Sequence, residues 1–489
     1  MTLIPYAEYR PDVSDYLSQY TQTAQNVVPR GDGYGPFLNL VTISASLGSA
    51  CRGFFKAVRT DGSILIFAAT ATRLFSLNNT TFAWTDVSKG ATTYSAVSST
   101  DNWQFAQFGN FIFATQSNTV LQVFDLTVSV AFADSLGSPP QARYIGVVGR
   151  FIVLTGLLSL PYRIAWSGLN DVNSVNSWTV GLNSCDVQDL PDGGIVRGVA
   201  GGEFGTILQD AVIRRMTYLP GSAVVFQIER LAEDVGLYAP YSLVRTNSRI
   251  FFLAPSGLMG MDSTGIPQPI GKERVDRTLL ADIDKANLQL FIGASDPRSC
   301  RVFWAYKSTN GSAGLFDKML CYDWTLDRFT PIEMSGEYLG SLSQPGITLE
   351  GLDSISSSID ALGVSLDSFT TSVTPEVACF DPTHSLGFFR GAPLEAIIET
   401  GEQTLQPRRM LVRGFTPITD ATAVLGSASM RENVQTAPTY SPESALLPDG
   451  FIETPVDCRY SRGRIRIPAA SIWSYARGID PEVVPMGFE

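Results

Sequence analysis

The chain has 489 residues and a formal net charge of −12, and only 17% of its residues are charged. This length allows two or three domains, or one large all-β domain with an appendage. An acidic chain without a long basic run is not suited to capturing nucleic acid through its phosphates. Gly, Pro, Phe and Tyr are plentiful, which favours strands and turns over surface helices, so we expect an all-β protein.

The N-terminal segment "MTLIPYAEYRPDVSDY" has neither the basic start nor the apolar stretch of a secretory signal. No apolar run approaches the ~20 residues of a membrane-spanning helix, so we expect folding in a cytoplasm and no membrane-spanning segment. The six cysteines are widely separated and form no Cys-x-x-Cys pair, which argues against a zinc finger and a disulfide framework. They are predicted to be buried free thiols: Cys51, Cys185, Cys300, Cys321, Cys379 and Cys458.

Residues 1–40 are interpreted as an N-terminal arm that leads into the first domain. Within this arm, "RGDGYGP" (30–36) is rich in glycine but lacks the Lys-Ser/Thr ending of a phosphate loop, and it ends in a proline rather than at a helix start. It is therefore predicted to be a turn.

Residues 41–334 contain a recurring unit in which a turn pair precedes a buried strand. Gly-Asn, Gly-Arg, Gly-Gly and Asn-Ser pairs suit tight hairpins because they tolerate positive φ. The turn segments are "QFGNFIFAT" (107–115), "VVGRFIVLT" (147–155), "VAGGEFGTIL" (199–208) and "RTNSRIFFLA" (245–254). The strand segments that follow them are "VLQVFDL" (120–126), "YRIAWSGL" (162–169), "AVIRRMTYL" (211–219) and "GLMGMDS" (257–263).

An earlier copy of the unit lies in residues 57–77, where Asp61-Gly62 forms the turn, and a later copy lies in residues 301–329. Successive units begin roughly 40 to 55 residues apart, which is the interval of a four-stranded propeller blade. We therefore predict an irregular β-propeller with six to seven blades. The blade count stays open because the repeat between residues 170 and 245 is poorly defined, and unrelated meanders in a β-sandwich are the alternative.

Residues 335–375 are interpreted as a Ser- and Gly-rich insertion. Its segment "GLDSISSSIDALGVSLDSF" (351–369) places apolar residues at the a and d positions of a heptad. The many Ser and Asp residues and Gly363 would destabilise an isolated coiled coil, so we expect this segment to gain order by docking on its own propeller or on an adjacent subunit. Its interface candidates are Leu352, Ile355, Ile359, Leu362, Leu366 and Phe369.

Residues 376–390 are predicted to supply a returning strand that closes the ring, and residues 391–489 are predicted to form a small additional β domain near the C-terminus. In "YSRGRIRIP", Arg462, Arg464 and Arg466 alternate with small or apolar residues, which indicates a strand with one cationic face. Two interpretations stay open: the arginines are solvated on an ordinary half-exposed strand, or they pair with acidic groups of a neighbouring subunit or partner.

The sequence offers no catalytic, cofactor-binding or metal-binding constellation. His384 is the single histidine and no Gly-x-Ser-x-Gly motif occurs, so His384 is predicted to be structural. Asp282 and Asp284 lack the central glycine and closing glutamate of a calcium loop and are expected to be solvated. Six tryptophans are expected to pack between blades: Trp84, Trp103, Trp166, Trp178, Trp304 and Trp324.

In their order along the chain, several segments resemble the tail nozzle or hub proteins of short-tailed bacteriophages (podoviruses), a family related in architecture to tail tubular protein B. The resemblance rests on the 351–369 heptads and on "NVVPRGDGYGPF", "WQFAQFGNFIFAT", "PPQARYIGVVGRFIVLTG", "IAWSGLND", "GAPLEAIIETGE" and "RYSRGRIRIP".

This resemblance implies a non-enzymatic structural virion protein that is assembled in the host cytoplasm and is located in the viral tail. It implies a homohexamer ring that binds the tail adaptor and tail fibre or spike proteins, and through which genomic DNA passes during DNA ejection without specific binding. No cofactor is implied. The alternative functions are a propeller glycosidase or lyase and a glycan-binding adhesin that acts on host surface polysaccharide.

Overall fold

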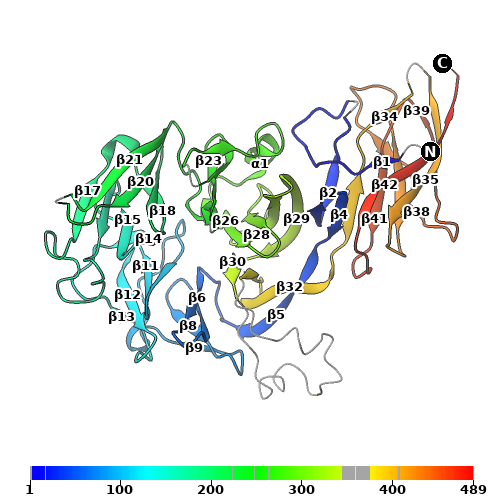
Figure 1. Ribbon diagram of the computed structural model, residues 1–489. Coiled ribbons are helices and arrows are strands. Elements are labelled where there is room, and N and C mark those ends of the chain that lie inside the picture. The colour runs from blue at the N-terminus through cyan, green and yellow to red at the C-terminus, as the bar shows by residue number, and fades with distance from the viewer. Residues whose placement is uncertain are drawn as a thin grey trace.

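The computed structural model describes residues 3–16, 18–222, 224–246, 248–262, 265–343, 358, 375–405 and 408–487. Strands account for nearly all of its regular structure (Figure 1). The described part of the chain contains one short α-helix, α1 (Asp276–Asp282). Four single 3-10 turns complete the helical elements: η1 (Lys89–Ala91), η2 (Pro191–Gly193), η3 (Pro240–Ser242) and η4 (Leu288–Leu290).

Seven four-stranded antiparallel sheets follow one another as the blades of a β-propeller. Blade 1 contains β6 (Phe54–Val58), β7 (Ile64–Ala69), β8 (Leu74–Leu77) and β9 (Trp84–Asp86), and blade 2 contains β10 (Gln104–Phe108), β11 (Phe111–Gln116), β12 (Thr119–Asp125) and β13 (Ala133–Asp134). Blade 3 contains β14 (Ala142–Val148), β15 (Phe151–Leu157), β16 (Arg163–Trp166) and β17 (Asp186–Asp189), and blade 4 contains β18 (Val196–Ala200), β19 (Gly205–Gln209), β20 (Val212–Tyr218) and β21 (Phe226–Glu233).

Blades 5 to 7 complete the ring. Blade 5 contains β22 (Val244–Arg245), β23 (Ile250–Ala254), β24 (Gly257–Met261) and β25 (Gln268–Pro269), and blade 6 contains β26 (Ile292–Asp296), β27 (Arg301–Tyr306), β28 (Phe316–Asp323) and β29 (Arg328–Gly336). Blade 7 contains β30 (Tyr338–Leu342), β31 (Glu376–Phe380), β32 (Ser385–Pro393) and, as its outer strand, β5 (Leu38–Ser46). The inner strand β30 also contacts β6 of blade 1, so the ring is closed.

The predicted turns lie between the first and second strands of the blades. Gly109 and Gly149 both have a φ of 55° in the turns that connect β10 to β11 and β14 to β15. This left-handed conformation is readily adopted by glycine and strained for other residues. The predicted all-β propeller fold is therefore confirmed, and the structure sets the number of blades at seven.

The ring is closed by a strand from the N-terminal part of the chain. β32 pairs with β5, so blade 7 joins segments more than 300 positions apart. Residues 376–390, predicted as one returning strand, lie in two strands, β31 and β32, and residues 335–343, predicted to belong to an insertion, contain β30. These differences arise because pairing between distant segments leaves no local pattern in the sequence.

The second domain is a β-sandwich that combines both ends of the chain. One sheet contains β1 (Ile4–Pro5), β3 (Val27–Arg30), β4 (Gly33–Pro36), β35 (Met410–Thr419), β39 (Ile452–Cys458) and β42 (Ala476–Pro485). The other contains β2 (Thr23–Gln25), β33 (Ala396–Glu399), β36 (Leu425–Met430), β37 (Thr439–Tyr440), β38 (Ser444–Ala445) and β41 (Gly463–Ile467), while β34 (Gln403–Thr404) pairs with β40 (Tyr460–Ser461). The predicted N-terminal arm is therefore four strands of this domain, and the glycine-rich segment 30–36 is the turn and second strand of the hairpin β3–β4.

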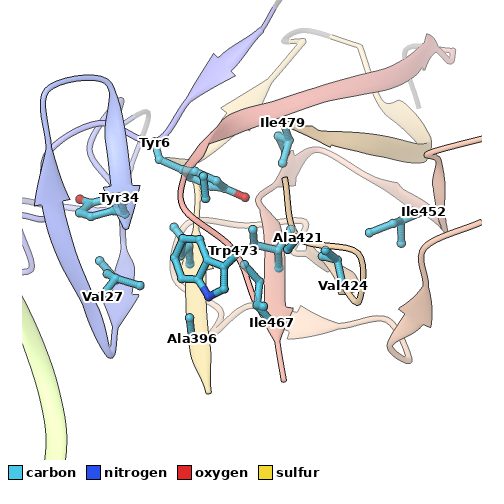
Figure 2. Packing of buried hydrophobic residues seen from close by; sticks show 14 of the residues in the cluster. Tyr6, Val27, Tyr34, Ala396, Ala421, Val424, Ile452, Ile467, Trp473 and Ile479 are labelled. Atoms are coloured by element: carbon cyan, nitrogen blue, oxygen red, sulfur yellow. The ribbon is translucent and has the colours of Figure 1, made fainter. Parts of the chain in front are cut away.

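Side chains from both ends of the chain fill the core between the two sheets (Figure 2). Tyr6, Val27 and Tyr34 from the N-terminal segment pack with Ile467 and Trp473 from the C-terminal segment. All five are almost completely buried. Because burial of apolar area is the main stabilising contribution, the C-terminal segment alone would leave much of this core exposed to water.

The sandwich is attached to blades 5 and 6 by polar contacts of its N-terminal segment. The Asn26 backbone N–H donates to the Pro331 carbonyl oxygen (3.0 Å), and the Asn26 side chain accepts from the Glu333 backbone N–H (2.8 Å). The Asp12 carboxylate accepts hydrogen bonds from the backbone N–H groups of Arg277 (2.8 Å) and Thr278 (2.9 Å) in the first turn of α1. Such a cap satisfies amides that a helix leaves unpaired. The two domains are thus joined by specific contacts as well as by the chain.

We expect Asp276 to make folding stability depend on pH. It is buried at the start of α1, where its Oδ1 accepts the Leu258 N–H (3.0 Å), and burial raises its pKa to about 6 from 3.8. The folded state therefore binds more protons than the unfolded state between about pH 4 and pH 6, so its stability falls as the pH rises through this window.

The measurement is urea unfolding of the wild type and of Asp276→Asn at pH 4, 5, 6 and 7. The free energy of unfolding of the wild type minus that of the variant should decrease as the pH rises from about 4 to 6 and level off near pH 7. A difference that stays constant with pH would contradict the assignment.

Candidate functional site

His384 lies at the junction between blade 7 and blade 1. Its Nδ1 is 2.5 Å from Oε1 of the buried Glu337, and Oε2 of Glu337 accepts the Cys51 N–H (2.9 Å). This carboxylate therefore links the turn between β31 and β32 to the segment that precedes β6. His384 thus takes part in a contact between two blades, which is consistent with the predicted structural role.

The three arginines of the predicted cationic strip carry out different roles inside the sandwich. Arg462 is buried and pairs with Glu399 (3.5 Å), with Glu402 (3.7 Å) and with Asp15. The buried Ile465 and Ile467 confirm the alternation of the strand.

The two arginines within β41, Arg464 and Arg466, are half-buried and also contact groups of their own chain. The Arg464 guanidinium lies over the ring of Tyr440 (5.1 Å to its centroid), and Arg466 pairs with Glu395 (3.0 Å) and with Glu443. The acidic partners of Arg462 and Arg466 are therefore intramolecular, which differs from both interpretations drawn from the sequence. The other interface candidates, from Leu352 to Phe369, lie outside the described residues.

Asp282 and Asp284 are not solvated as expected. Asp282 pairs with Lys318 (2.8 Å), and Asp284 pairs with Lys307 (2.7 Å). The hydrogen bond from Lys307 is the main reason that the pKa of Asp284 is lowered to about 2. Strand pairing in blade 6 places these lysines next to the two aspartates. Because the lysines and aspartates are far apart in the sequence, the sequence pattern does not indicate these ion pairs. In the described residues, no group of three or more His, Cys, Asp or Glu side chains is placed to hold a metal ion.

The predicted core residues agree in large part with the structure. Trp103, Trp166, Trp178 and Trp304 are buried, whereas Trp84 and Trp324 are half-buried. All six cysteines are free, and five are buried, the exception being Cys300, which is half-buried. No helix in the described ranges is long and apolar enough to cross a membrane.

The central cavity of the propeller was not predicted from the sequence. It has a volume of about 450 Å³ and is lined by the inner strands of all seven blades. This volume falls within the range of about 300 to 1,000 Å³ that is usual for small-molecule sites. Its walls include aromatic side chains, among them Phe55 and Phe105, whose rings stack with centroids 5.9 Å apart.

Side chains meet across the axis at the end of the cavity where the inner strands begin. The Asn102 backbone N–H donates to the Tyr241 hydroxyl (2.7 Å), and the Asn102 side chain donates to the Gln289 carbonyl oxygen (2.8 Å). Arg52 in turn donates to the Asn102 side-chain oxygen (3.0 Å). These residues precede the inner strands of blades 1, 2, 5 and 6, which lie on different sides of the ring. They therefore narrow this end, and the cavity is a pocket rather than a wide pore.

Two cations line the cavity toward the end where the inner strands finish. Lys56 of β6 donates to the Ser343 hydroxyl (2.8 Å), and Arg245 of β22 donates to the Gly201 carbonyl oxygen. They are the charged side chains of the lining in the described part of the chain, and both are positive. Burial lowers the pKa of Lys56 and that of Arg245 from their usual values. The sequence contains one signal for this site, because in "FFKAV" (β6) Lys56 interrupts an otherwise apolar strand.

No protein-family model matches the chain, and no curated protein matches it. Among solved structures, the chain is similar to the extracellular domain of a putative hybrid two-component system from B. thetaiotaomicron, with 10% identity and a TM-score of 0.44 over 86% of this chain and 47% of that one. It is also similar to the extracellular domain of a putative one-component system from the same organism (9% identity, TM-score 0.41, 78% of this chain and 43% of that one).

A chain of a mitotic checkpoint complex is a further similar structure, with 9% identity and a TM-score of 0.39 over 74% of this chain and 97% of that one. The chain spans about half the length of the two B. thetaiotaomicron proteins. Similarity at this level carries no information about ligand or partner.

Proposed function

We propose that this chain is a non-enzymatic structural protein of a short-tailed phage tail, a nozzle or hub that assembles as a hexameric ring around the path of the DNA and binds the tail adaptor and fibres. The observation that carries the proposal is the joining of the propeller to a sandwich built from both ends of the chain. Asp12 and Asn26 fix this sandwich to blades 5 and 6. A block fixed in this way is suited to transmit force in a ring, and the sequence resemblance points to the same role.

The DNA path in this proposal lies between copies of the chain. The propeller's own cavity of about 450 Å³ has the size of a small-molecule site, and Asn102 and Tyr241 narrow one of its ends. A duplex therefore has to pass through a lumen enclosed by several subunits. The net charge of −12 gives the protein an overall negative charge, which weakens non-specific adhesion of DNA.

Blades 2 and 3 carry a surface poor in charge that suits a contact between copies, and the exposed Asp134 next to it pairs with Lys89 (2.5 Å). The segments 126–133, 135–142 and 172–185 contain no charged residue, and hydrogen bonds to the Asn173 side chain join two of them. Val128, Val130 and Val175 on this surface are 78%, 89% and 74% exposed. Because two acidic copies repel one another, they can approach at least electrostatic cost through an apolar face that is poor in charge. In a ring, this face would contact a different face of the neighbouring copy.

We expect the double variant Val130→Lys/Val175→Lys to prevent ring assembly, because burying two ammonium groups in an apolar contact is unfavourable. Ile472→Lys is the control, since Ile472 is 87% exposed but lies on the sandwich. Mass photometry and negative-stain imaging of the purified chain, alone and with the tail adaptor of the same virus, measure the assembly. The wild type and the control should form rings, and the double variant should stay monomeric.

The proposed function would be overturned if the wild-type protein remained monomeric at high concentration and did not bind the adaptor. Incubation with capsule and lipopolysaccharide preparations would then distinguish the two alternatives. Release of reducing ends would indicate a glycosidase or lyase, and binding without cleavage would indicate an adhesin.

A further inference from the structure

The charge of the central cavity is opposite to that of the protein as a whole. The chain carries a net charge of −12, yet among the described residues the cavity is lined by Lys56 and Arg245 and by no carboxylate. The two cations come from blades 1 and 5, which lie on different sides of the ring. The cavity is therefore a cationic pocket in an acidic protein.

The partners of these two cations are neutral. Lys56 donates to the Ser343 hydroxyl and Arg245 to the Gly201 carbonyl oxygen, and in the described part of the chain neither forms an ion pair with a carboxylate. Lys307 and Lys318, by contrast, pair with aspartates at 2.7 and 2.8 Å. Lys56 is half-buried, whereas Arg245 is exposed. Placing the Lys56 ammonium in a partly buried site without a counter-charge is unfavourable, and an anion in the cavity would relieve that cost.

We infer that the central cavity binds a small organic anion, with a carboxylate or phosphate group placed between Lys56 and Arg245. Ammonium and guanidinium groups both form strong charge-assisted hydrogen bonds with such oxygens. This binding activity goes beyond the structural role proposed above and does not depend on assembly.

The rest of the lining suits a ligand of the size of one sugar unit. The stacked rings of Phe55 and Phe105 offer an apolar surface, and Gln104 adds an amide that can donate or accept hydrogen bonds. A cavity of about 450 Å³ accommodates a ligand of this kind together with some water. Polar groups in fixed positions on an apolar wall are the usual composition of a specific small-molecule site.

The test is isothermal titration of the full chain with three probes that share one ring: glucuronate, glucose 6-phosphate and glucose. At least one anionic probe should bind with one site per chain, and glucose should bind at least tenfold more weakly. Binding of glucuronate alone would identify a carboxylate site, and binding of glucose 6-phosphate alone a phosphate site. If neither anion binds, or if glucose binds equally well, the inference is wrong.

Variants locate the site. Lys56→Gln and Arg245→Gln should each weaken binding of the anionic probe at least tenfold, whereas Lys56→Arg, which keeps the charge, should retain most of it. The controls Lys285→Gln and Arg59→Gln remove the same charges from exposed positions outside the cavity and should leave the affinity unchanged. Equal affinities in the cavity variants and the controls would show that the anion binds elsewhere. Mass photometry of the same samples measures their oligomeric state, so that a change in anion affinity can be distinguished from a change in ring assembly.

Discussion

Arg462→Met should lower the free energy of unfolding by about 3 to 5 kcal/mol, because removing one partner of a buried ion pair leaves an uncompensated charge. The Arg462 guanidinium is buried in the sandwich within 4 Å of the carboxylates of Glu399 and Glu402, which are themselves buried. In the variant, Glu402 keeps its ion pair with Arg431 (2.5 Å), but Glu399 loses its ion pair with residue 462. Methionine fills much of the same volume but cannot replace the charge.

The matched control is Arg466→Met, four residues further along the chain in β41. Arg466 is half-buried, and its partners Glu395 and Glu443 are accessible to water, so we expect a loss of about 1 kcal/mol or less. Urea unfolding followed by circular dichroism measures both variants. Equal losses for the two would contradict the assignment of Arg462 to a buried network.

Trp304→Ala should lower the free energy of unfolding by about 3 to 5 kcal/mol, the usual cost of emptying the space of a buried aromatic side chain. Trp304 is fully buried between blades 5 and 6, and its indole N–H donates to the Ser242 carbonyl oxygen (2.9 Å). The substitution therefore leaves a cavity and also a buried carbonyl without its donor. Both effects act at a contact between blades, so the ring as a whole should become less stable.

Trp324→Ala tests whether the effect depends on burial. Trp324 packs against the same cluster, where it stacks on Phe251, but it is half-buried, so water can occupy part of the space that it leaves. We expect it to lose about half as much stability as Trp304→Ala or less, since less apolar area is exposed. A loss at Trp324 equal to that at Trp304 would show that the blade contact does not depend on the buried indole.

The fold class was predictable because the relevant signals are local. Turn pairs such as Gly109-Asn110 and Gly149-Arg150 fall next to apolar strands at a regular interval, and each forms the first hairpin of a blade. Ring closure was not predictable in this way. β5 pairs with β32, and β2 pairs with β33, over separations of more than 300 positions, and the sequence of one strand does not specify its distant partner.

The candidate site shows the same limit. The alternation around Arg464 predicts a strand with one apolar face, and the buried Ile465 confirms it, but the pattern does not tell which carboxylates the arginines meet. Lys56 and Arg245 are almost 190 positions apart and share a cavity only because the ring brings their strands to one axis. Sites formed at the centre of a closed ring therefore require the fold before they can be identified.

The most direct test of the proposed function is cryo-electron microscopy of intact short-tailed phage tails that should contain this chain if the proposal holds. We predict a ring of copies below the adaptor, in which the propeller and sandwich fit as one rigid block and the DNA path runs between subunits. A tail map with no density for this fold, or one in which the DNA path coincides with a propeller's own axis, would contradict the account.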